Sequence, residues 1–329
     1  MSARPSPERP FPARTKKSGW RILGTSLLVF VALVAGTEAV LRFGLGLGDP
    51  VLIAPDPACS YITRPDQNVH RFFVHTYINR YGMRSDEISP VPPPGVVRVL
   101  FVGDSLTNGT THVDQRNIFT QIVGRGLPSI VHHPVEVLNA SANGWAPDNE
   151  WSWVRTRGIF HSNFVLLVLN SADLTQPRAL ISQLTEGDLP QRRPATAIGE
   201  LCTRFIVPRI LRIARHADPG DVVLPDEDVQ RANLEDLARF HVLVTGQGGQ
   251  MALVFLPLRK DVPTLSTPAD KVLHDWSAAN GVPLIDLTPA IAPYPTGEIS
   301  LSDHTHFNTA GNAIIGQAIL KLWPASLQP

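Results

Sequence analysis

The segment "VVRVLFVGDSL", residues 96–106, decides the fold. Val96–Val102 is an apolar, mostly β-branched run bounded by Gly95 and Gly103, and a short run of this kind between turn residues predicts a buried strand. The run ends abruptly in Gly, Asp and Ser, so Ser105 follows the end of the strand. Ligands bind beyond the carboxyl ends of the strands in an open parallel sheet. The segment therefore predicts a strand of the sheet and a position suited to a reactive serine.

Four further apolar runs predict strands, and amphipathic segments separate them. The other strands are expected at Val135–Asn139, Phe164–Asn170, Met251–Leu256 and Pro283–Leu287. The helices are expected at Asn117–Leu127, Asp148–Gly158, Asp226–Gly246, Pro268–Gly281 and Asn308–Trp323. Strands that alternate with helices and are apolar on both faces are typical of a parallel sheet covered on two sides. We therefore expect an α/β fold with a five-stranded, mainly parallel sheet.

An apolar segment near the N-terminus predicts a transmembrane helix. The segment "ILGTSLLVFVALVAGTEAVL", residues 22–41, carries a single charge, Glu38, and a helix of about 20 residues spans a hydrocarbon core of roughly 30 Å. Six Lys or Arg residues precede it, and none lies between Arg42 and Arg64. Positive charge stays on the cytoplasmic side, which places the large domain outside the cytoplasm. Glu38 and Arg42 are four residues apart and are expected to pair near the outer interface.

A cleaved signal peptide is the competing interpretation of this segment. Small residues near Ala35 and Gly36 are compatible with cleavage. The apolar run is long for a signal peptide, however, and no clean A-x-A site ends it. We therefore favour a single-pass anchor in the inner (cytoplasmic) membrane, with a periplasmic or extracellular domain.

The composition changes along the chain indicate its organisation. Residues 44–94 are rich in Pro, Gly and Asp, which predicts a linker or pre-domain segment with some ordered pieces. Mixed polarity interrupts the alternation of strands and helices between residues 174 and 225 and indicates an insertion. The expected units are a cytoplasmic basic tail (1–21), a transmembrane helix (22–43), the pre-domain segment (44–94) and a hydrolase-like domain (95–329) that contains the insertion.

Charge and metal-ligand counts narrow the classes of partner. Lys and Arg total 29, as do Asp and Glu, and this balance lacks the basic surface typical of a nucleic-acid-binding protein. Cys59 and Cys202 cannot form a zinc site by themselves; they either pair in an oxidising compartment or remain free thiols. His304 and His306 form an H-x-H pair without a third ligand. We therefore expect no metal, no organic cofactor and no nucleic-acid partner.

A candidate base and its orienting group lie near the C-terminus. Asp303 and His306 are three residues apart, just before the last expected helix. This spacing lets the carboxylate reach one imidazole nitrogen, which leaves the other to accept the proton of Ser105, as a serine nucleophile requires. Asp173, after the third strand, is an alternative partner for His306. The structural alternatives are that Ser105 is a turn residue and His306 a packing residue.

These segments resemble a known family. "GDSL" (Gly103–Leu106) and "DHTHFN" (Asp303–Asn308) resemble the first and last motif blocks of the GDSL, or SGNH, hydrolase superfamily, over roughly Val96–Trp323. The stretch "NRYGMR" (Asn79–Arg84) is similar to the segment that precedes the family's domain in membrane-anchored members. The resemblance implies a flavodoxin-like three-layer α/β/α fold, ester hydrolysis or acyl transfer, and Ser105, His306 and Asp303 as nucleophile, base and orienter.

The resemblance also implies an oxyanion hole. Its donors would be the backbone N–H groups of Ser105 and Gly144, where a glycine allows close approach to the developing oxyanion. The family's third block supplies an asparagine side chain, but if Asp173 aligns with the family aspartate, Ala172 occupies that asparagine position. Asn170 substitutes through a shifted loop, or the site works with the two backbone donors, or catalysis is weak.

Taken together, these features predict an extracytoplasmic serine esterase that is anchored in the membrane. Its substrate is expected to be an ester, such as an O-acyl group on an envelope glycan or lipid. The alternatives are an O-acyltransferase that acts on envelope polysaccharide with the same triad, and a non-catalytic glycan-binding or assembly protein with a degenerate site. No stretch of the sequence specifies the acyl length.

Overall fold

The structure is a computed structural model that describes residues 17–183, 189–214, 227–258, 268–327 and 329. Most of the predicted basic tail (residues 1–16) and two parts of the predicted insertion (residues 184–188 and 215–225) lie outside the described residues.

The chain folds around a five-stranded sheet in the order β6-β5-β7-β8-β9, in which every neighbouring pair is parallel. The strands are β5 (Val97–Gly103), β6 (Val135–Ser141), β7 (Phe164–Leu169), β8 (Gln250–Phe255) and β9 (Leu284–Asp286). Each predicted strand is present, so the prediction of an α/β fold with a five-stranded parallel sheet is confirmed. All seven residues of β5 are buried because the strand has neighbours on both edges and helices on both faces.

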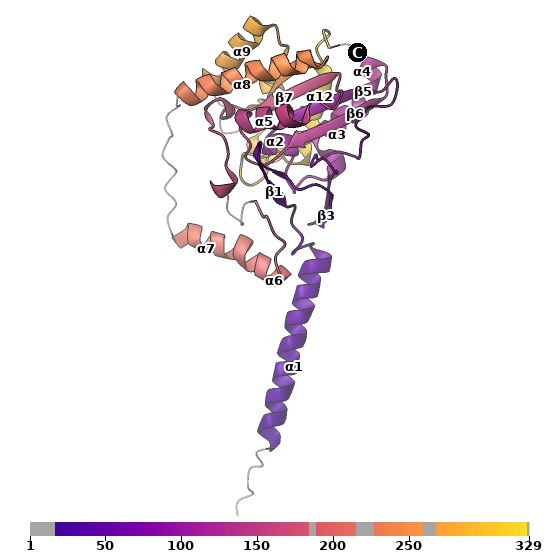
Figure 1. The fold of residues 1–329 in the computed structure, drawn as a ribbon. Helices are drawn as coiled ribbons and strands as arrows, with labels where there is room; N and C mark the ends of the chain where they lie inside the picture. Colours follow the sequence, from indigo (N-terminus) through magenta and orange to yellow (C-terminus); the bar gives the residue numbers. More distant parts are fainter. Residues whose placement is uncertain (1–16, 184–188, 215–226, 259–267, 328) are drawn as a thin grey trace, which may run out of the picture.

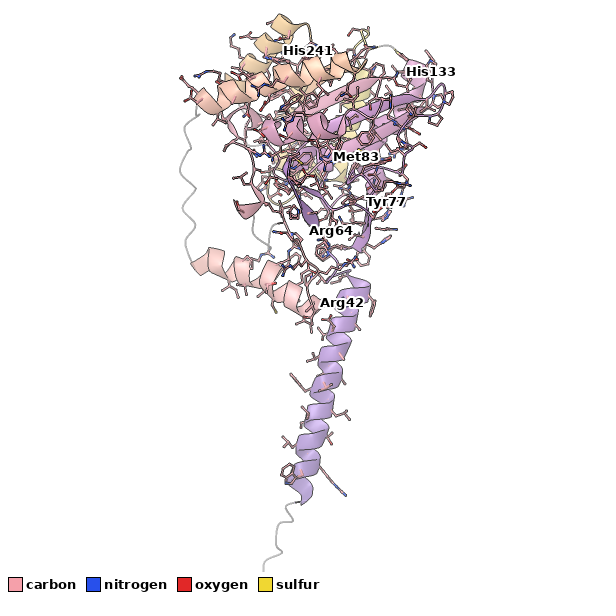
Figure 2. All side chains as sticks on the ribbon, viewed as in Figure 1. Arg42, Arg64, Tyr77, Met83, His133 and His241 are labelled. Carbon is pink, nitrogen blue, oxygen red and sulfur yellow. The ribbon has the colours of Figure 1, made fainter. Side chains whose placement is uncertain are left out.

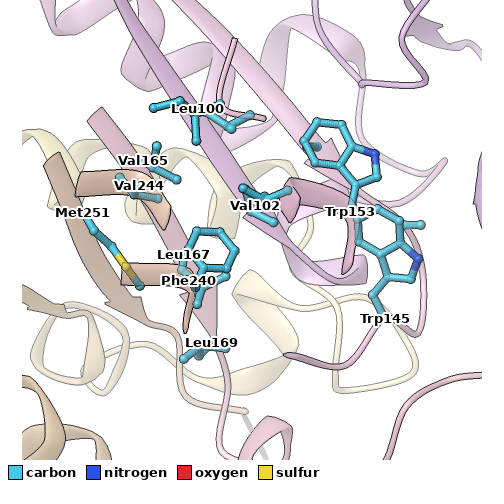
Figure 3. Packing of buried hydrophobic residues seen from close by; sticks show 14 of the residues in the cluster. Leu100, Val102, Trp145, Trp153, Val165, Leu167, Leu169, Phe240, Val244 and Met251 are labelled. Carbon is cyan, nitrogen blue, oxygen red and sulfur yellow. The ribbon is translucent and has the colours of Figure 1, made fainter. Parts of the chain in front are cut away.

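Successive side chains of a strand point to opposite faces, and the two faces of the sheet belong to two hydrophobic clusters. Leu100 and Val102 pack in the cluster of α5 (Pro147–Arg157) and α8 (Glu227–Gly246), part of which is drawn in Figure 3. The other face of β5 packs in the cluster of α3 (Phe119–Gly126) and α12 (Thr309–Lys321). This arrangement confirms the predicted three-layer α/β/α architecture.

Two antiparallel hairpins precede the sheet. They are formed by β1 (Ile53–Asp56) with β2 (Ser60–Thr63) and by β3 (Gln67–Arg71) with β4 (Val74–Ile78). Side chains of this segment, among them Cys59, Tyr61 and Met83, join the core cluster on the α5 side of the sheet. In Figure 2, Tyr77 of β4 and Arg64, which follows β2 in the link between the hairpins, lie between the long N-terminal helix and the sheet.

Further helices, most of them short, connect and flank these elements. They are η2 (Gln115–Asn117), α2 (Ser105–Asn108), α4 (Pro128–Val131), η3 (Asp173–Thr175), η4 (Ile181–Gln183), α6 (Ala197–Glu200), η5 (Leu201–Ile206), α7 (Val207–Ala214), α9 (Pro268–Asn280), α10 (Thr288–Ile291) and α11 (Thr296–Ile299).

The N-terminal helix α1 (Lys17–Ala39) continues into a short π-helix, η1 (Val40–Gly44), and projects away from the domain (Figure 1). Over residues 19–44 its mean hydropathy reaches 1.9 and none of the most apolar window is buried. The helix is long and apolar enough to cross a membrane, and a signal sequence near an N-terminus has the same properties. The predicted Glu38–Arg42 pair is present, with an N–O distance of 2.9 Å.

Candidate active site

Ser105 begins the short helix α2 just after β5 ends. Asp104 caps this helix, and its carboxylate accepts a hydrogen bond from the Leu106 N–H at 2.8 Å. An Asp side chain at this position satisfies one of the N–H groups that the first turn of a helix leaves unpaired. The cap fixes the direction in which the chain leaves the sheet and so places the Ser105 side chain at the carboxyl end of the strands.

Ser105, His306 and Asp303 form one chain of hydrogen bonds. The Ser105 Oγ lies 2.8 Å from His306 Nε2, and His306 Nδ1 lies 2.7 Å from Asp303 Oδ2. The Asp303 Oδ1 atom also accepts hydrogen bonds from the backbone N–H groups of Thr305 and His306, at 2.9 and 3.0 Å. A carboxylate in this position favours the imidazole tautomer of His306 that carries the proton on Nδ1. The Nε2 atom is then free to accept the serine proton.

The same contacts determine the ionisation of Asp303. Partial burial raises its pKa, but the hydrogen bonds from the His306 side chain and from the two backbone N–H groups outweigh burial, so the pKa lies below its usual value. Asp173, the alternative partner, is fully buried and accepts hydrogen bonds from the Asn170 N–H at 2.7 Å and from the Asn170 amide at 2.8 Å. The structure therefore pairs His306 with Asp303 and pairs Asp173 with Asn170.

Gly144 lies in a loop that lines the same pocket as Ser105 and His306. Its φ is +79°, a conformation that favours glycine, and an added Cβ would lie 3.2 Å from the hydroxyl of Tyr61. Within the described chain the Gly144 N–H donates to no other protein group. The Tyr61 hydroxyl donates to the Asn143 carbonyl at 2.8 Å, and Gln176 Nε2 donates to the Gly144 carbonyl at 3.1 Å. These two contacts hold the loop beside the pocket with the Gly144 N–H unengaged.

Two buried carboxylates and a backbone N–H engage the Asn170 amide. The amide nitrogen donates to Asp173 Oδ1 at 2.8 Å and to Asp104 Oδ2 at 3.2 Å, and the amide oxygen accepts from the Ala172 N–H. Asn170 is buried and is not among the residues that line the pocket. Both amide hydrogens are directed at buried carboxylates, so this side chain clamps Asp104 and Asp173 together. Burial raises the pKa of Asp104 to about 6.

Arg84 is a residue of the site's surroundings that the sequence analysis did not single out. Its guanidinium is fully buried and donates to the carbonyls of Asn108 at 2.7 Å and Val113 at 2.6 Å, and also to that of Thr110. These carbonyls belong to the end of α2 and the loop that follows it. Burial lowers the pKa of Arg84 to about 9. The available signal was its place at the end of the "NRYGMR" stretch.

The pocket around Ser105 has a volume of 640 Å³ and combines distant parts of the chain. The sheet edge supplies Ser105, and the loop before α12 supplies His306. The hairpins contribute residues such as Arg71, and η5 contributes Arg204 and Phe205. The pocket is therefore shared between the sheet and the segments next to α1. Trp145, in contrast, is buried in the core, where its indole N–H donates to the Tyr61 carbonyl at 3.0 Å.

The structure also bears on the remaining His and Cys residues. His304 has a φ of +58° and lies exposed. The described residues contain no group of three or more His, Cys, Asp or Glu side chains that could hold a metal ion. Cys59 is buried and Cys202 is exposed, and both are free thiols.

Comparisons with known proteins find similarity to solved structures. No protein-family model matches the chain, and no curated protein matches it. A lipase/acylhydrolase from Enterococcus faecalis is 17% identical, with a TM-score of 0.42, and the match covers 68% of this chain and 94% of that one. A member of the lipolytic protein G-D-S-L family from Veillonella parvula DSM 2008 is 12% identical, with a TM-score of 0.43 and coverage of 69% and 98%. A two-domain esterase active on acetylated mannans is 11% identical, with a TM-score of 0.44 and coverage of 69% and 48%.

Proposed function

We propose that the protein is an ester hydrolase of the GDSL/SGNH type in which Ser105 is the nucleophile. The observation that carries the proposal is the hydrogen-bonded chain from Ser105 Oγ through the His306 ring to the Asp303 carboxylate. Nucleophile, base and orienter are all within hydrogen-bond reach, which is the arrangement that activates a serine hydroxyl. The "GDSL" and "DHTHFN" segments that supply these residues support the same assignment.

The geometry gives each residue a role in two successive steps. Ser105 Oγ attacks the ester carbonyl while its proton passes to His306 Nε2. The ester C–O bond then breaks, and the alcohol leaves with that proton. Water enters, gives a proton to the same nitrogen and attacks the acyl carbon. The bond between that carbon and Ser105 Oγ then breaks, the acid leaves, and the proton on His306 Nε2 returns to Ser105 Oγ. Asp303 holds the imidazole in place and stabilises its positive charge between these transfers.

Two backbone donors would stabilise the tetrahedral oxyanion. The Gly144 N–H is unengaged and the Ser105 N–H lies at the start of α2. The Asn170 amide already donates to Asp104 and Asp173, and we therefore propose a site that works without it as a third donor. A missing oxyanion donor costs about 10²–10³ in turnover in other serine hydrolases, so we expect turnover below that of a site with three donors.

Covalent labelling of Ser105 tests the proposal directly. The full chain is treated with a fluorophosphonate probe, which forms a bond to an activated serine. Wild type and the surface control Ser129→Ala are expected to label, whereas Ser105→Ala and His306→Ala are not. A folded wild-type protein that does not label supports instead a non-catalytic glycan-binding or assembly role, and the hydrolase assignment is then wrong.

The substrate class that we propose is an O-acyl ester on an envelope glycan or lipid, because the pocket adjoins the segments next to α1. Hydrolysis is separated from acyl transfer by incubating the enzyme with an acetyl donor and a glycan acceptor. Free acetate as the main product supports an esterase. Acetylated glycan in excess of free acetate supports an O-acyltransferase that uses the same triad.

We also propose that α1 anchors the protein in the cytoplasmic membrane with the sheet domain outside. The charge asymmetry around residues 22–41 and the unburied apolar surface of α1 support this topology. A reporter fused after Pro329 is expected to be active only outside the cytoplasm, and protease added to spheroplasts should degrade the domain. Protection of the domain contradicts this orientation, and release of a form that lacks about 40 N-terminal residues indicates a cleaved signal peptide.

A further inference from the structure

The segment α6–η5–α7 is attached to the end of α1. The Glu38 carboxylate in α1 accepts hydrogen bonds from the backbone N–H groups of Ala197 at 2.8 Å and Ile198 at 3.0 Å. Arg42 donates to the carbonyl of Ala195 at 3.2 Å and to Glu38. In Figure 1 this segment runs sideways from the upper end of α1 instead of continuing along it. These contacts therefore fix the position of the segment at the end of α1.

A buried ion pair attaches the same segment to the second hairpin. Glu200 is fully buried and lies 2.9 Å from Arg71 of β3 and 3.0 Å from Arg204 of η5. The Phe72 ring packs edge-on against Phe205, with 5.9 Å between the ring centroids. The end of α1, the β3–β4 turn and the segment α6–η5–α7 therefore form one joined layer beneath the sheet domain.

This layer exposes an apolar strip, which we define as Phe43, Phe73, Ile206, Val207 and Ile210. Phe43 is 84% exposed, Phe73 is 90% exposed and Ile210 is 58% exposed. Ile206 and Ile210 are four residues apart and Val207 and Ile210 are three apart, so these three side chains share one helix face. Large apolar side chains that neighbouring elements leave exposed together mark a surface that contacts a membrane or another protein.

The β3–β4 turn shows that Phe73 is not placed there by local backbone preference. Phe72 and Phe73 both have positive φ, 49° and 64°, in a two-residue hairpin turn. Such turns favour Asn and Gly because a bulky side chain is strained in this region. Phe72 packs against Phe205, but Phe73 points to solvent. The turn thus holds an exposed aromatic ring beside the end of α1 against its backbone preference.

We propose that the apolar strip lies on the lipid surface of the membrane that α1 spans. The proposal rests on the proposed topology of α1, because its occupant is identified by continuity with that helix: the strip begins at Phe43, where the apolar span ends. The exposed Arg209 between Val207 and Ile210 suits a helix in the interface, where basic side chains meet lipid phosphates.

The strip also places the pocket of Ser105. Arg204 and Phe205 line that pocket and directly precede Ile206 and Val207 of the strip. If the strip is seated on lipid, the pocket opens next to the membrane surface. The substrate class that this geometry selects is an acyl ester carried by a membrane lipid or another amphiphile within that surface.

The depth of the strip can be measured in the full chain. Ile210→Cys, in a Cys202→Ser background that leaves only the buried Cys59, is labelled with bimane and reconstituted in vesicles of phosphatidylethanolamine and phosphatidylglycerol. Val242→Cys is the matched control, because Val242 is apolar, is more exposed than Ile210 (71%) and belongs to α8, which lies at the end of the domain opposite α1 in Figure 1. Spin-labelled lipid is expected to quench bimane at position 210 and to leave position 242 unquenched. The proposal is overturned if spin-labelled lipid quenches bimane at the two positions to the same extent. It is also overturned if the bimane emission at position 210 changes with the density of protein in the vesicle and not with the quencher, and this result indicates that a second copy of the chain occupies the strip.

A second experiment tests the consequence for the substrate. Val207→Asp combined with Ile210→Asp is compared with Val242→Asp, with circular dichroism as the check on folding. Burial of one large apolar side chain shifts a binding equilibrium by about tenfold, so hydrolysis of a vesicle-borne ester should fall by about tenfold or more. Hydrolysis of a short water-soluble ester should not change. Equal losses on both esters, or no loss on either, contradict substrate access from the membrane.

The hydrolase assignment and the lipid docking of the apolar strip can be tested independently. Fluorophosphonate labelling of Ser105 is measured on the same vesicles. If Ser105 does not label but the probe at position 210 is quenched, the hydrolase assignment is wrong and the docking surface stands. If Ser105 labels and the probe at position 210 is not quenched, the hydrolase assignment stands and the docking surface is wrong.

Discussion

The sheet region (residues 95–329) and the hairpin region (residues 45–94) are encoded in different ways. The central strands of the sheet, β5, β7 and β8, are mostly apolar and lie buried between helices, and β5 is buried throughout. The hairpin strands have four or five residues each and alternate between buried and exposed positions, as in β3. Their buried side chains join the core cluster of the sheet. The sheet region therefore has a hydrophobic core of its own, whereas the hairpin region is stabilised by packing against that core.

The two regions also divide the work at the candidate site. Ser105, Asp303 and His306 all come from the sheet region. The loops that carry the site are supported from the hairpin region, by Arg84 behind α2 and by Tyr61 beneath Gly144. Substitutions can test this division, because it predicts that changes to the triad residues of the sheet region remove the chemistry and that changes in the hairpin region disturb the loops that carry the site.

The largest effect is expected within the sheet region, at Asp303. Asp303→Asn removes the charge that orients His306, and the equivalent change in another serine triad lowers turnover by about 10⁴. Asp173→Asn is the matched control, since Asp173 contacts Asn170 and not His306. Ester turnover of both variants, with circular dichroism as the folding check, decides between them. Near-normal turnover in Asp303→Asn, or a larger loss in Asp173→Asn, shows that the triad is assigned wrongly.

The Ser105–His306–Asp303 geometry could be predicted because it depends on local rules. Ser105 follows a strand whose apolar run identifies it, and Asp303 reaches His306 over three residues. Only the meeting of the two segments requires the fold, and parallel strands bring their carboxyl ends to one edge. The same reasoning did not place the Asn170 side chain, because its direction depends on which buried carboxylates need a donor.

The hairpin region could not be predicted in the same detail. Its strands are too short for a clear period, and the β3–β4 turn carries Phe72-Phe73 where Asn-Gly would be the recognisable signal. The role of Arg84 is equally hidden, because a lone arginine in a polar stretch usually indicates solvent exposure. Its burial follows from three carbonyl acceptors that only the folded chain assembles.

The next largest effect is expected from the hairpin region, at Arg84. Arg84→Met leaves several buried carbonyls without a donor, and each unsatisfied group costs about 1–3 kcal/mol. We expect the free energy of unfolding to fall by roughly 3 kcal/mol or more. Arg80→Met, which breaks an exposed pair with Glu87, should cost less than about 1 kcal/mol. Urea denaturation of both variants measures the difference, and similar losses would mean that the hairpin region does not support α2 as described.

A smaller effect is expected in the sheet region at Glu150, a buried residue of α5 whose carboxylate oxygens have no hydrogen-bond partner. Burial, with the charges of Asp173 and Asp104, raises the pKa of Glu150 well above its usual value. The folded state then holds a proton that the unfolded state has released, so stability falls as pH rises above the unfolded pKa of about 4.3.

Glu150→Gln should remove the contribution of Glu150 to this pH dependence, whereas the raised pKa values of Asp104 and Asp173 continue to contribute. The slope of the unfolding free energy against pH becomes flatter by at most about 1.4 kcal/mol per pH unit, and the variant gains stability relative to wild type between pH 5 and pH 8. Thermal unfolding across that range provides the measurement. Parallel curves for wild type and Glu150→Gln would show that Glu150 is ionised in the fold without penalty.

The smallest effect is expected at Tyr61, where the hairpin region meets the proposed oxyanion donor. Burial raises the pKa of Tyr61, so its hydroxyl stays protonated and donates to the Asn143 carbonyl next to Gly144. Tyr61→Phe removes this one hydrogen bond, which is worth about 1 kcal/mol or about fivefold in rate. If the bond positions the Gly144 N–H, kcat falls by about that factor while KM is unchanged, because the oxyanion forms only after binding.

Tyr77→Phe, which loses a surface hydrogen bond to Glu87, is the control and should alter neither constant. A rise in KM at constant kcat would place Tyr61 in substrate binding, and unchanged kinetics with lowered stability would limit the hairpin region to a purely structural role at this loop.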